Sequence, residues 1–321
     1  MLERSLLSKI ARTAIGAYIA AIASSLMILV WVMKLWDANL YVPLSYVGDS
    51  IFTAALIKGL IDNGWYLYNP FLGAPYGLYM YDFPLSNNLD FIVLRLISLI
   101  IRDYAFTMNL YFLLTFPLTT LTSMLVLRQL KVSYASSILG SLLYTFLSYH
   151  FWRGEGHLFL AAYYMIPLMV MVLFWVYSDK NLLLYEVGGG IQANVFNQKT
   201  LMSIIICLII SSTFIYYPFF SCFFLIVTGV TASLRHRSKT PLITSLLFVV
   251  LITAGVLINV SPTLIYQHEN GNNPAIAIRT PEEAEYYGLK MTQLLMPISR
   301  HSVFLLAGAA KKYTMSRNRH Q

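Results

Sequence analysis

Between its first two long apolar segments the chain reads Val47-Gly48-Asp49-Ser50, Asn63-Gly64-Trp65-Tyr66, Leu72-Gly73-Ala74-Pro75-Tyr76-Gly77 and Tyr81-Asp82-Phe83-Pro84. These motifs belong to a polar and aromatic loop that we place at residues 34–103. Loops beyond about 15 residues without a regular core of their own are uncommon and usually functional. This loop carries acidic residues in a chain otherwise poor in charge. We therefore expect any chemistry to begin here.

The composition identifies the surroundings of the rest of the chain. Of the 321 residues, 58% are hydrophobic and 11% are charged, and the mean hydropathy is +0.64, whereas soluble domains carry roughly 25% charged residues. The net charge of +8 comes from short basic clusters between apolar runs. Because these clusters form no continuous basic face, they argue against nucleic-acid binding. The composition predicts an integral protein of the lipid bilayer.

The apolar runs predict the fold class. A membrane-spanning helix needs roughly 20 apolar residues, and about seven segments qualify. We expect an all-α integral membrane protein, a multi-span helical bundle with a large first extracytoplasmic loop carrying two surface helices. Its domains would be a membrane domain at residues 1–264 and an extracytoplasmic loop with a truncated tail at residues 265–321. The expected spans are residues 13–33, 104–127, 133–150, 158–177, 201–217, 219–234 and 241–264.

The basic residues predict the orientation, because short loops rich in lysine and arginine stay cytoplasmic. They precede the first span and follow the second, fourth and sixth. This pattern predicts a multi-pass protein of the cell membrane with a cytoplasmic N-terminus. The loop 34–103, the turn 151–157 and the segment 265–301 would then lie outside. The basic residues concerned are Arg4, Lys9, Arg12, Arg128, Lys131, Lys180, Arg235, Arg237 and Lys239.

This arrangement resembles the GT-C superfamily of membrane glycosyltransferases, which have an acidic residue in the large first outer loop. Several short sequence motifs are similar to the amino-terminal part of bacterial YfhO-like membrane proteins. The resemblance implies transfer of a sugar from a polyprenyl-phosphate carrier to an acceptor of the cell envelope, outside the cytoplasm. The similar motifs are Gly48-Asp49, Asn63-Gly64-Trp65, Leu72 to Gly77, Asp82-Phe83-Pro84, Arg153 to His157 and Pro281 to Leu289.

The resemblance implies a catalytic role for Asp49, as the general base that takes a proton from the acceptor hydroxyl. Such assistance is typically worth roughly 10² to 10⁴ fold in rate. The residues themselves leave another interpretation open, because an aspartate just before a helical run is a good N-cap. Asp82 is the second catalytic candidate, and an aspartate that forms a turn is the alternative there.

A second group of candidates lies at the outer junction of the third and fourth spans. Arg153 would contact the carrier phosphate through planar, charge-assisted donors, and His150 and His157 would bind substrate beside it. The alternative is a short solvated turn in which Arg153 pairs with Glu155 and the histidines only line the membrane interface.

Two further substrate-binding candidates lie elsewhere. Arg279 would reach a carrier phosphate, with surface solvation as the alternative, and Trp65 belongs to an aromatic set that suits a sugar-binding surface or the membrane interface. Some GT-C enzymes use a divalent cation, which stays open as a cofactor. The histidines show neither a tight i, i+4 pair nor H-E-x-x-H spacing, so we assign no metal site.

Two other classes of function remain open. A polytopic transporter or flippase of glycolipids would also show many spans with glycine and proline breaks, but transporters usually place ionisable groups near the bilayer midplane. Here many acidic residues and histidines concentrate in the outer segments, which favours an enzyme. The third possibility is an inactive, truncated glycosyltransferase-like protein, because residues 302–310 are too short to cross a membrane.

Overall fold

The computed structural model describes residues 2–83, 85–188, 190–271, 273–274, 280–281, 283 and 303–317. The chain divides into two units, Met1–Asn272 and Asn273–Gln321. The domain boundary expected at residue 264 therefore lies inside the last helix of the first unit, which continues to Asn270. In the second unit the described residues include the helix α14 (Phe304–Arg317).

Helices make up most of the first unit, together with two short antiparallel hairpins. One hairpin pairs β1 (Tyr68–Asn69) with β2 (Leu78–Tyr79), and the other pairs β3 (Leu184–Val187) with β4 (Gly190–Ala193). The helices are α1 (Leu2–Val32), α2 (Asp49–Asn63), α3 (Asn88–Ser98), α4 (Tyr104–Gln129), α5 (Tyr134–Thr145), α6 (Ser148–Arg153), α7 (Leu158–Ala161), α8 (Ile166–Ser178), α9 (Gln198–Ile210), α10 (Tyr216–His236) and α11 (Thr240–Asn270), with the 3-10 turns η1 (Met80–Asp82) and η2 (Glu155–His157).

Five segments of the described chain are long and apolar enough to cross a membrane. This finding confirms the all-α membrane protein that the composition predicts. Two of the seven expected spans are shorter than a bilayer requires. The span expected at residues 133–150 is divided between α5 and α6. The one expected at 201–217 is divided between α9, a helix of only 13 residues or roughly 20 Å, and the start of α10. The five long segments are Thr13–Val32, Tyr104–Gln129, Glu155–Ser178, Tyr216–His236 and Thr240–Asn270.

Helix α9 ends early because polar groups terminate it. Ser211 follows its last residue, and Nδ2 of Asn259 in α11 donates to the backbone oxygen of Ser211 at 3.3 Å and to Oγ of Ser212 at 3.0 Å. The bond to Ser211 satisfies a carbonyl group that a continued helix would otherwise have satisfied internally. The chain then turns back, and α10 begins at Tyr216.

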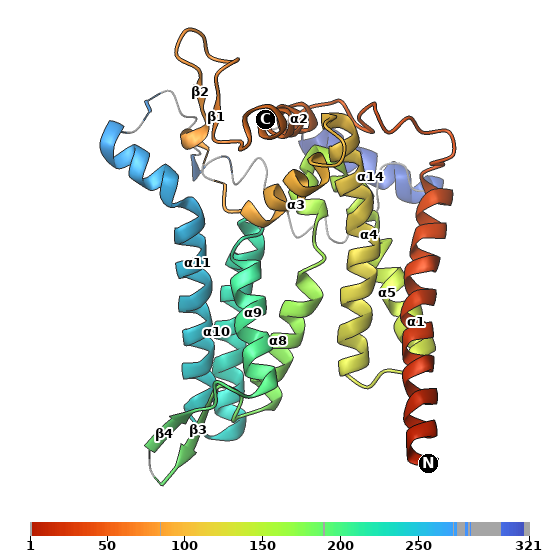
Figure 1. The fold of residues 1–321 in the computed structure, drawn as a ribbon, viewed down its shortest axis with the longest axis vertical. Coiled ribbons are helices and arrows are strands. Elements are labelled where there is room, and N and C mark those ends of the chain that lie inside the picture. The colour runs from red at the N-terminus through yellow and green to blue at the C-terminus, as the bar shows by residue number, and fades with distance from the viewer. Residues whose placement is uncertain are drawn as a thin grey trace. The chain divides into compact units, whose positions relative to one another are not determined.

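The loops of the first unit gather at its two ends (Figure 1). Helices α2 and α3 and the β1–β2 hairpin lie at one end, which we call the loop end, whereas the β3–β4 hairpin and the beginning of α1 lie at the other. Helices α8 and α10 finish at this second end, where Nε2 of His236 lies 3.0 Å from the backbone oxygen of Tyr177. The basic residues that follow α8 and α10 therefore lie at the same end of the unit as the beginning of α1. The cytoplasmic location of that end stays a prediction.

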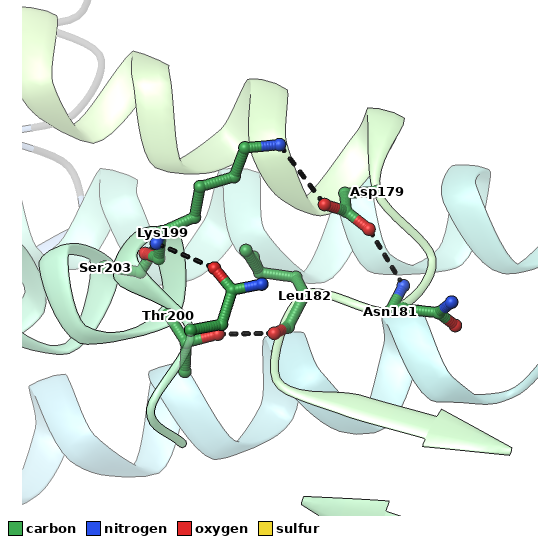
Figure 2. A network of polar contacts seen from close by, with 7 residues as sticks. Asp179, Asn181, Leu182, Lys199, Thr200 and Ser203 are labelled. Atoms are coloured by element: carbon green, nitrogen blue, oxygen red, sulfur yellow. Dashed lines mark hydrogen bonds and ion pairs between the residues drawn. The ribbon is translucent and has the colours of Figure 1, made fainter. Parts of the chain in front are cut away.

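A polar network joins α8 to α9 at this second end (Figure 2). Nζ of Lys199 lies 3.3 Å from Oδ2 of Asp179, whose Oδ1 accepts the N–H of Asn181 at 3.1 Å. Oγ1 of Thr200 donates to the backbone oxygen of Leu182. The network fixes the segment between the two helices before the chain enters the β3–β4 hairpin.

At the loop end, α3 is held against α2 by a guanidinium group. Nη1 of Arg95 donates to the backbone oxygens of Leu60 and Ile61 at 3.2 and 3.4 Å. These oxygens belong to the last turn of α2, where the helix dipole favours a cation. Fully buried Phe91 of α3 stacks on Tyr66, with ring centroids 3.8 Å apart. Helices α2 and α3 thus form one packed layer over the end of α4.

This layer contains a buried carboxyl group, that of Asp90 in the first turn of α3. The residue is 1% exposed, and its Oδ1 accepts a hydrogen bond from the hydroxyl of Tyr111 at 2.6 Å. Loss of hydration on burial raises the pKa of Asp90 to about 7, although the Tyr111 hydrogen bond acts in the opposite direction. Between pH values of about 4 and 7 the folded protein therefore holds a proton that the unfolded chain releases.

We expect the protein to lose stability as the pH rises through this window. The raised pKa corresponds to roughly 4 kcal/mol of unfolding free energy, fully present below the unfolded pKa and lost as the pH approaches the folded one. Asp90→Asn keeps an oxygen for Tyr111 but cannot titrate, so its thermal midpoint in detergent should depend less on pH than that of the original protein.

The matched control is Asp62→Asn, because Asp62 forms a surface pair with Lys58 at 2.9 Å. Its midpoints should follow the pH dependence of the original protein. Equal slopes for the Asp90→Asn variant and the original protein would show that Asp90 does not titrate as described.

Candidate active site

The loop that leads from α1 to α2 is held in place by one amide side chain of α4. Oδ1 of Asn109 accepts the N–H of Leu44 at 3.1 Å, and its Nδ2 donates to the backbone oxygens of Leu40 and Val42 at 2.8 Å each. Asn109 is fully buried. Three backbone groups of an irregular segment are thus satisfied by one side chain, which fixes the path of the loop.

The next residue of the loop is held by a different part of the chain. Oε2 of Glu155 accepts the N–H of Ser45 at 2.7 Å, across 110 residues of sequence. The backbone then turns at Gly48, whose φ of 60° favours glycine, and α2 begins at Asp49. Asn109 and Glu155 together therefore set where the first residue of α2 lies.

Asp49 is not the N-cap of α2, which corrects one of the two interpretations of this residue. Gly48 occupies the cap position, and the hydroxyl of Ser50 makes the local bonds, accepting the N–H of Val47 at 2.8 Å and donating to its backbone oxygen at 2.9 Å. The side chain of Asp49 is 72% exposed, and its Oδ2 lies 3.6 Å from Nδ1 of His157. The carboxylate is therefore available to a ligand.

The opposite wall comes from the junction of α6 with η2. Helix α6 ends at Arg153 and is followed by Gly154, whose φ is 46°. A Cβ atom built on Gly154 would lie 3.1 Å from the backbone oxygen of Phe151. In the turn η2 that follows this reversal, Glu155 is only 2% exposed, whereas His157 is exposed. The positive φ explains why glycine suits this position.

Arg153 lies beside this reversal and is not neutralised by the nearby acid. Arg153 and Glu155, both described, do not form an ion pair, so the pairing left open by the sequence is not seen. The guanidinium carbon of Arg153 lies 5.3 Å from the centre of the Tyr149 ring, a cation–π geometry. Its buried Nε has no hydrogen-bond partner among the described residues.

These elements line an open cavity of about 450 Å³, which we call the polar cavity. It brings together Asp49, Arg153 and His157, three of the residues that the sequence analysis selects. Two loop segments far apart in the sequence form its walls. The lining residues are Ser45, Val47, Gly48, Asp49, Phe151, Trp152, Arg153, Gly154, Glu155, Gly156 and His157.

A second cavity, the apolar groove, shares Arg153 with the polar cavity. It has a volume of about 530 Å³, is bounded by α5, α6, α8 and α10, and has a mostly apolar and aromatic lining. Arg153 is thus the charged residue that belongs to both cavities. The aromatic residues of the groove are Tyr144, Tyr149, Tyr163, Tyr216, Tyr217, Phe220 and Phe224.

His150 lies apart from this site, although the sequence analysis groups it with His157. It is fully buried, with Nε2 2.8 Å from Oγ1 of Thr115 and Nδ1 2.9 Å from the backbone oxygen of Thr145. Its ring stacks on Phe116 with centroids 3.8 Å apart. Because both ring nitrogens already have partners, His150 is a core residue and does not line either cavity.

Asp82 and Trp65 also lie away from the polar cavity. Asp82 ends the turn η1 and does not line the cavity. Trp65 packs near Phe91, with ring centroids 6.2 Å apart, and lines a separate cavity of about 460 Å³ with Asn88 and Asn259. Arg279 lies outside the described residues.

Sequence reasoning misses Asn109 and gives Glu155 only the role of a partner for Arg153. A signal for Asn109 exists, because an amide inside an apolar span usually has a specific polar partner. Within the described part of the chain, no group of three or more histidine, cysteine or acidic side chains could hold a metal ion.

We expect Asn109→Ala to loosen the loop without unfolding the bundle. Each hydrogen bond lost is worth about 1 kcal/mol, so the amides of residues 40–45 should exchange with deuterium at least about tenfold faster. Peptides from α10 and α11 should exchange as before.

Asn181→Ala at the second end of the first unit is the matched control and should leave residues 40–45 protected. Unchanged protection of that segment in the Asn109→Ala variant would show that other contacts hold the loop.

Comparison with known proteins identifies no family for this chain. No family model, no curated protein and no solved structure matches it. The function is therefore inferred from the two cavities and the residues that form them.

Proposed function

We propose that this protein is a GT-C-like glycosyltransferase that moves a sugar from a polyprenyl-phosphate carrier to an acceptor outside the cytoplasm. The observation that carries the proposal is the position of Arg153, which belongs both to the apolar groove and to the polar cavity. A glycosylated lipid phosphate has the same order of parts: an apolar chain, an anionic phosphate and a polar sugar.

The apolar groove supports a lipid-linked donor. Its aromatic and aliphatic walls between α8 and α10 match the chemistry of a polyprenyl chain. Arg153 has planar, charged donors that suit a phosphate. Since it has no ion-pair partner among the described residues, a phosphate would meet an uncompensated cation.

The polar cavity supports the chemical step. The acceptor oxygen would attack the anomeric carbon while the bond from that carbon to the phosphate oxygen breaks. The proton of the acceptor hydroxyl would pass to the carboxylate of Asp49, and the carrier phosphate would leave with its charge stabilised by Arg153. His157, 3.6 Å from Asp49, would orient this carboxylate.

A flippase explains these features less well. A path for a sugar headgroup across the bilayer requires polar groups along the spans, near the midplane. Asp49 and His157 instead lie where α2 and η2 meet, at the loop end of the unit. An enzyme with a site at the membrane surface uses this placement directly.

We expect Asp49→Asn to lower sugar transfer by roughly 10² to 10⁴ fold, the usual contribution of a general base. Membranes containing the variant would be incubated with radiolabelled polyprenyl-phosphate sugars, and label in the acceptor would be counted. Folding should be unaffected, because the Asp49 side chain is 72% exposed and caps no helix.

Asp62→Asn, in the same helix, is the matched control and should transfer normally. Full transfer by a well-inserted Asp49→Asn variant would remove Asp49 from the mechanism. Transfer by no sample, the original protein included, would contradict the proposed activity.

We expect Arg153→Lys to weaken donor binding more than turnover. Lysine keeps the charge but loses the planar pair of donors, so KM for the carrier-linked sugar should rise about tenfold while kcat changes less. Steady-state kinetics in detergent with a short-chain polyprenyl-phosphate sugar would measure both constants.

Arg235→Lys is the matched control, because Arg235 also lies over a tyrosine ring, that of Tyr177 at 4.8 Å, at the second end of the unit. It should leave KM unchanged. An unchanged KM for Arg153→Lys would place the phosphate elsewhere.

A further inference from the structure

One carboxylate oxygen in the wall of the polar cavity has no function in the mechanism above. Glu155 is 2% exposed, and its Oε2 accepts the N–H of Ser45 at 2.7 Å. Its Oε1 is buried and has no hydrogen-bond partner among the described residues. The N–H of Leu44 also interacts with this carboxylate, but its hydrogen bond of good geometry goes to Oδ1 of Asn109. One oxygen of Glu155 thus holds the loop, and the other lacks a hydrogen bond of its own.

An unpartnered oxygen of this kind is unusual, because nearly all buried polar atoms in folded proteins have a hydrogen-bond partner. Burial without a partner destabilises the folded protein, and more so for a carboxylate than for a neutral group. Glu155 lines the polar cavity, so a ligand there can supply the missing donor.

The wall offers a complementary atom close by in the sequence. Nε of Arg153 is a buried donor without an acceptor among the described residues, and only Gly154 separates the two residues. The wall of the cavity therefore contains one unused acceptor and one unused donor just below its surface. A hydroxyl group satisfies both kinds of atom, because it donates one hydrogen bond and accepts others.

We propose that Glu155 determines which sugar is accepted, by receiving at Oε1 a hydrogen bond from a hydroxyl of the sugar being transferred. This inference rests on the proposed function and names the substrate class of the same site. Asp49 and Glu155 both line this cavity, and their carboxylates disfavour an anionic sugar there. The site therefore takes a neutral hydroxylated sugar in preference to a uronic acid.

Burial is what makes Glu155 suited to this role. An exposed carboxylate such as that of Asp49 exchanges a lost sugar contact for water, so it discriminates weakly. A buried acceptor that loses its donor gains no such compensation, and sites built in this way reject analogues that lack the hydroxyl. Asp49 would thus take the proton, while Glu155 selects the sugar.

The test uses Glu155→Gln, which has nearly the same shape. Its amide oxygen can still accept the N–H of Ser45, and this bond directs the NH₂ group to the position of Oε1. The acceptor at that position then becomes a donor while the loop stays held. Glu186→Gln is the matched control. Glu186 belongs to the β3–β4 hairpin at the other end of the unit, and its Oε1 accepts a hydrogen bond from the hydroxyl of Ser238.

The full-length protein in detergent would be given short-chain polyprenyl-phosphate glucose, mannose and galactose, together with their singly deoxygenated and uronic acid analogues. We expect the original protein and Glu186→Gln to transfer one neutral sugar at least about tenfold faster than one of its deoxy analogues and faster than its uronic acid. In Glu155→Gln this preference for the hydroxyl should fall at least about tenfold.

A role limited to holding the loop would lower all rates together and leave the ratio between sugar and deoxy analogue unchanged, which would overturn the inference. The same conclusion follows if the original protein transfers sugars without discriminating between the analogues. If it transfers none of the panel, the proposed activity itself fails, a result distinct from the other two.

Discussion

An irregular backbone segment beside a membrane must find partners for its N–H and carbonyl groups, and the candidate site depends on how this chain meets that requirement. The loop before α2 receives its hydrogen bonds from Asn109 of α4 and Glu155 of η2. These bonds hold it against the end of the bundle. Asp49 lies a few residues further along the chain. The position of its carboxylate therefore depends on Asn109 and Glu155, two residues that are distant from it in the sequence.

The same end of the molecule joins two environments. The apolar groove between α8 and α10 suits a hydrocarbon chain, and the polar cavity beside it contains carboxylates, an imidazole and glycine backbone. Arg153 lies where they meet and has a tyrosine ring beneath it rather than an acid. This placement leaves its charge available to an anion, which is why we favour a lipid phosphate as the ligand over a purely structural role for Arg153.

Local sequence patterns predict the site in part. Asp49, Arg153 and His157 are selected from an acidic loop and a short polar turn, and they do line one cavity. His150 has the same side chain as His157 and lies in the same turn region, yet it is buried against Phe116. Hydropathy likewise overestimates α5 and α9, because an apolar run does not reveal where polar contacts such as those of Asn259 end a helix. The burial of a side chain and its hydrogen-bond partners depend on how other helices pack against it.

The sequence by itself determines that the chain belongs in a membrane and that a long acidic and aromatic loop follows the first span, because hydropathy and charge are local properties of the residues. Only the tertiary structure decides that Asp49 faces His157, that Glu155 is buried while His157 two residues later is exposed, and that Arg153 belongs to two cavities. The physical reason is that these relations arise from the packing of α2, α4, α6 and α8 and from the reversal at Gly154. Contacts between residues more than a hundred positions apart leave no local pattern.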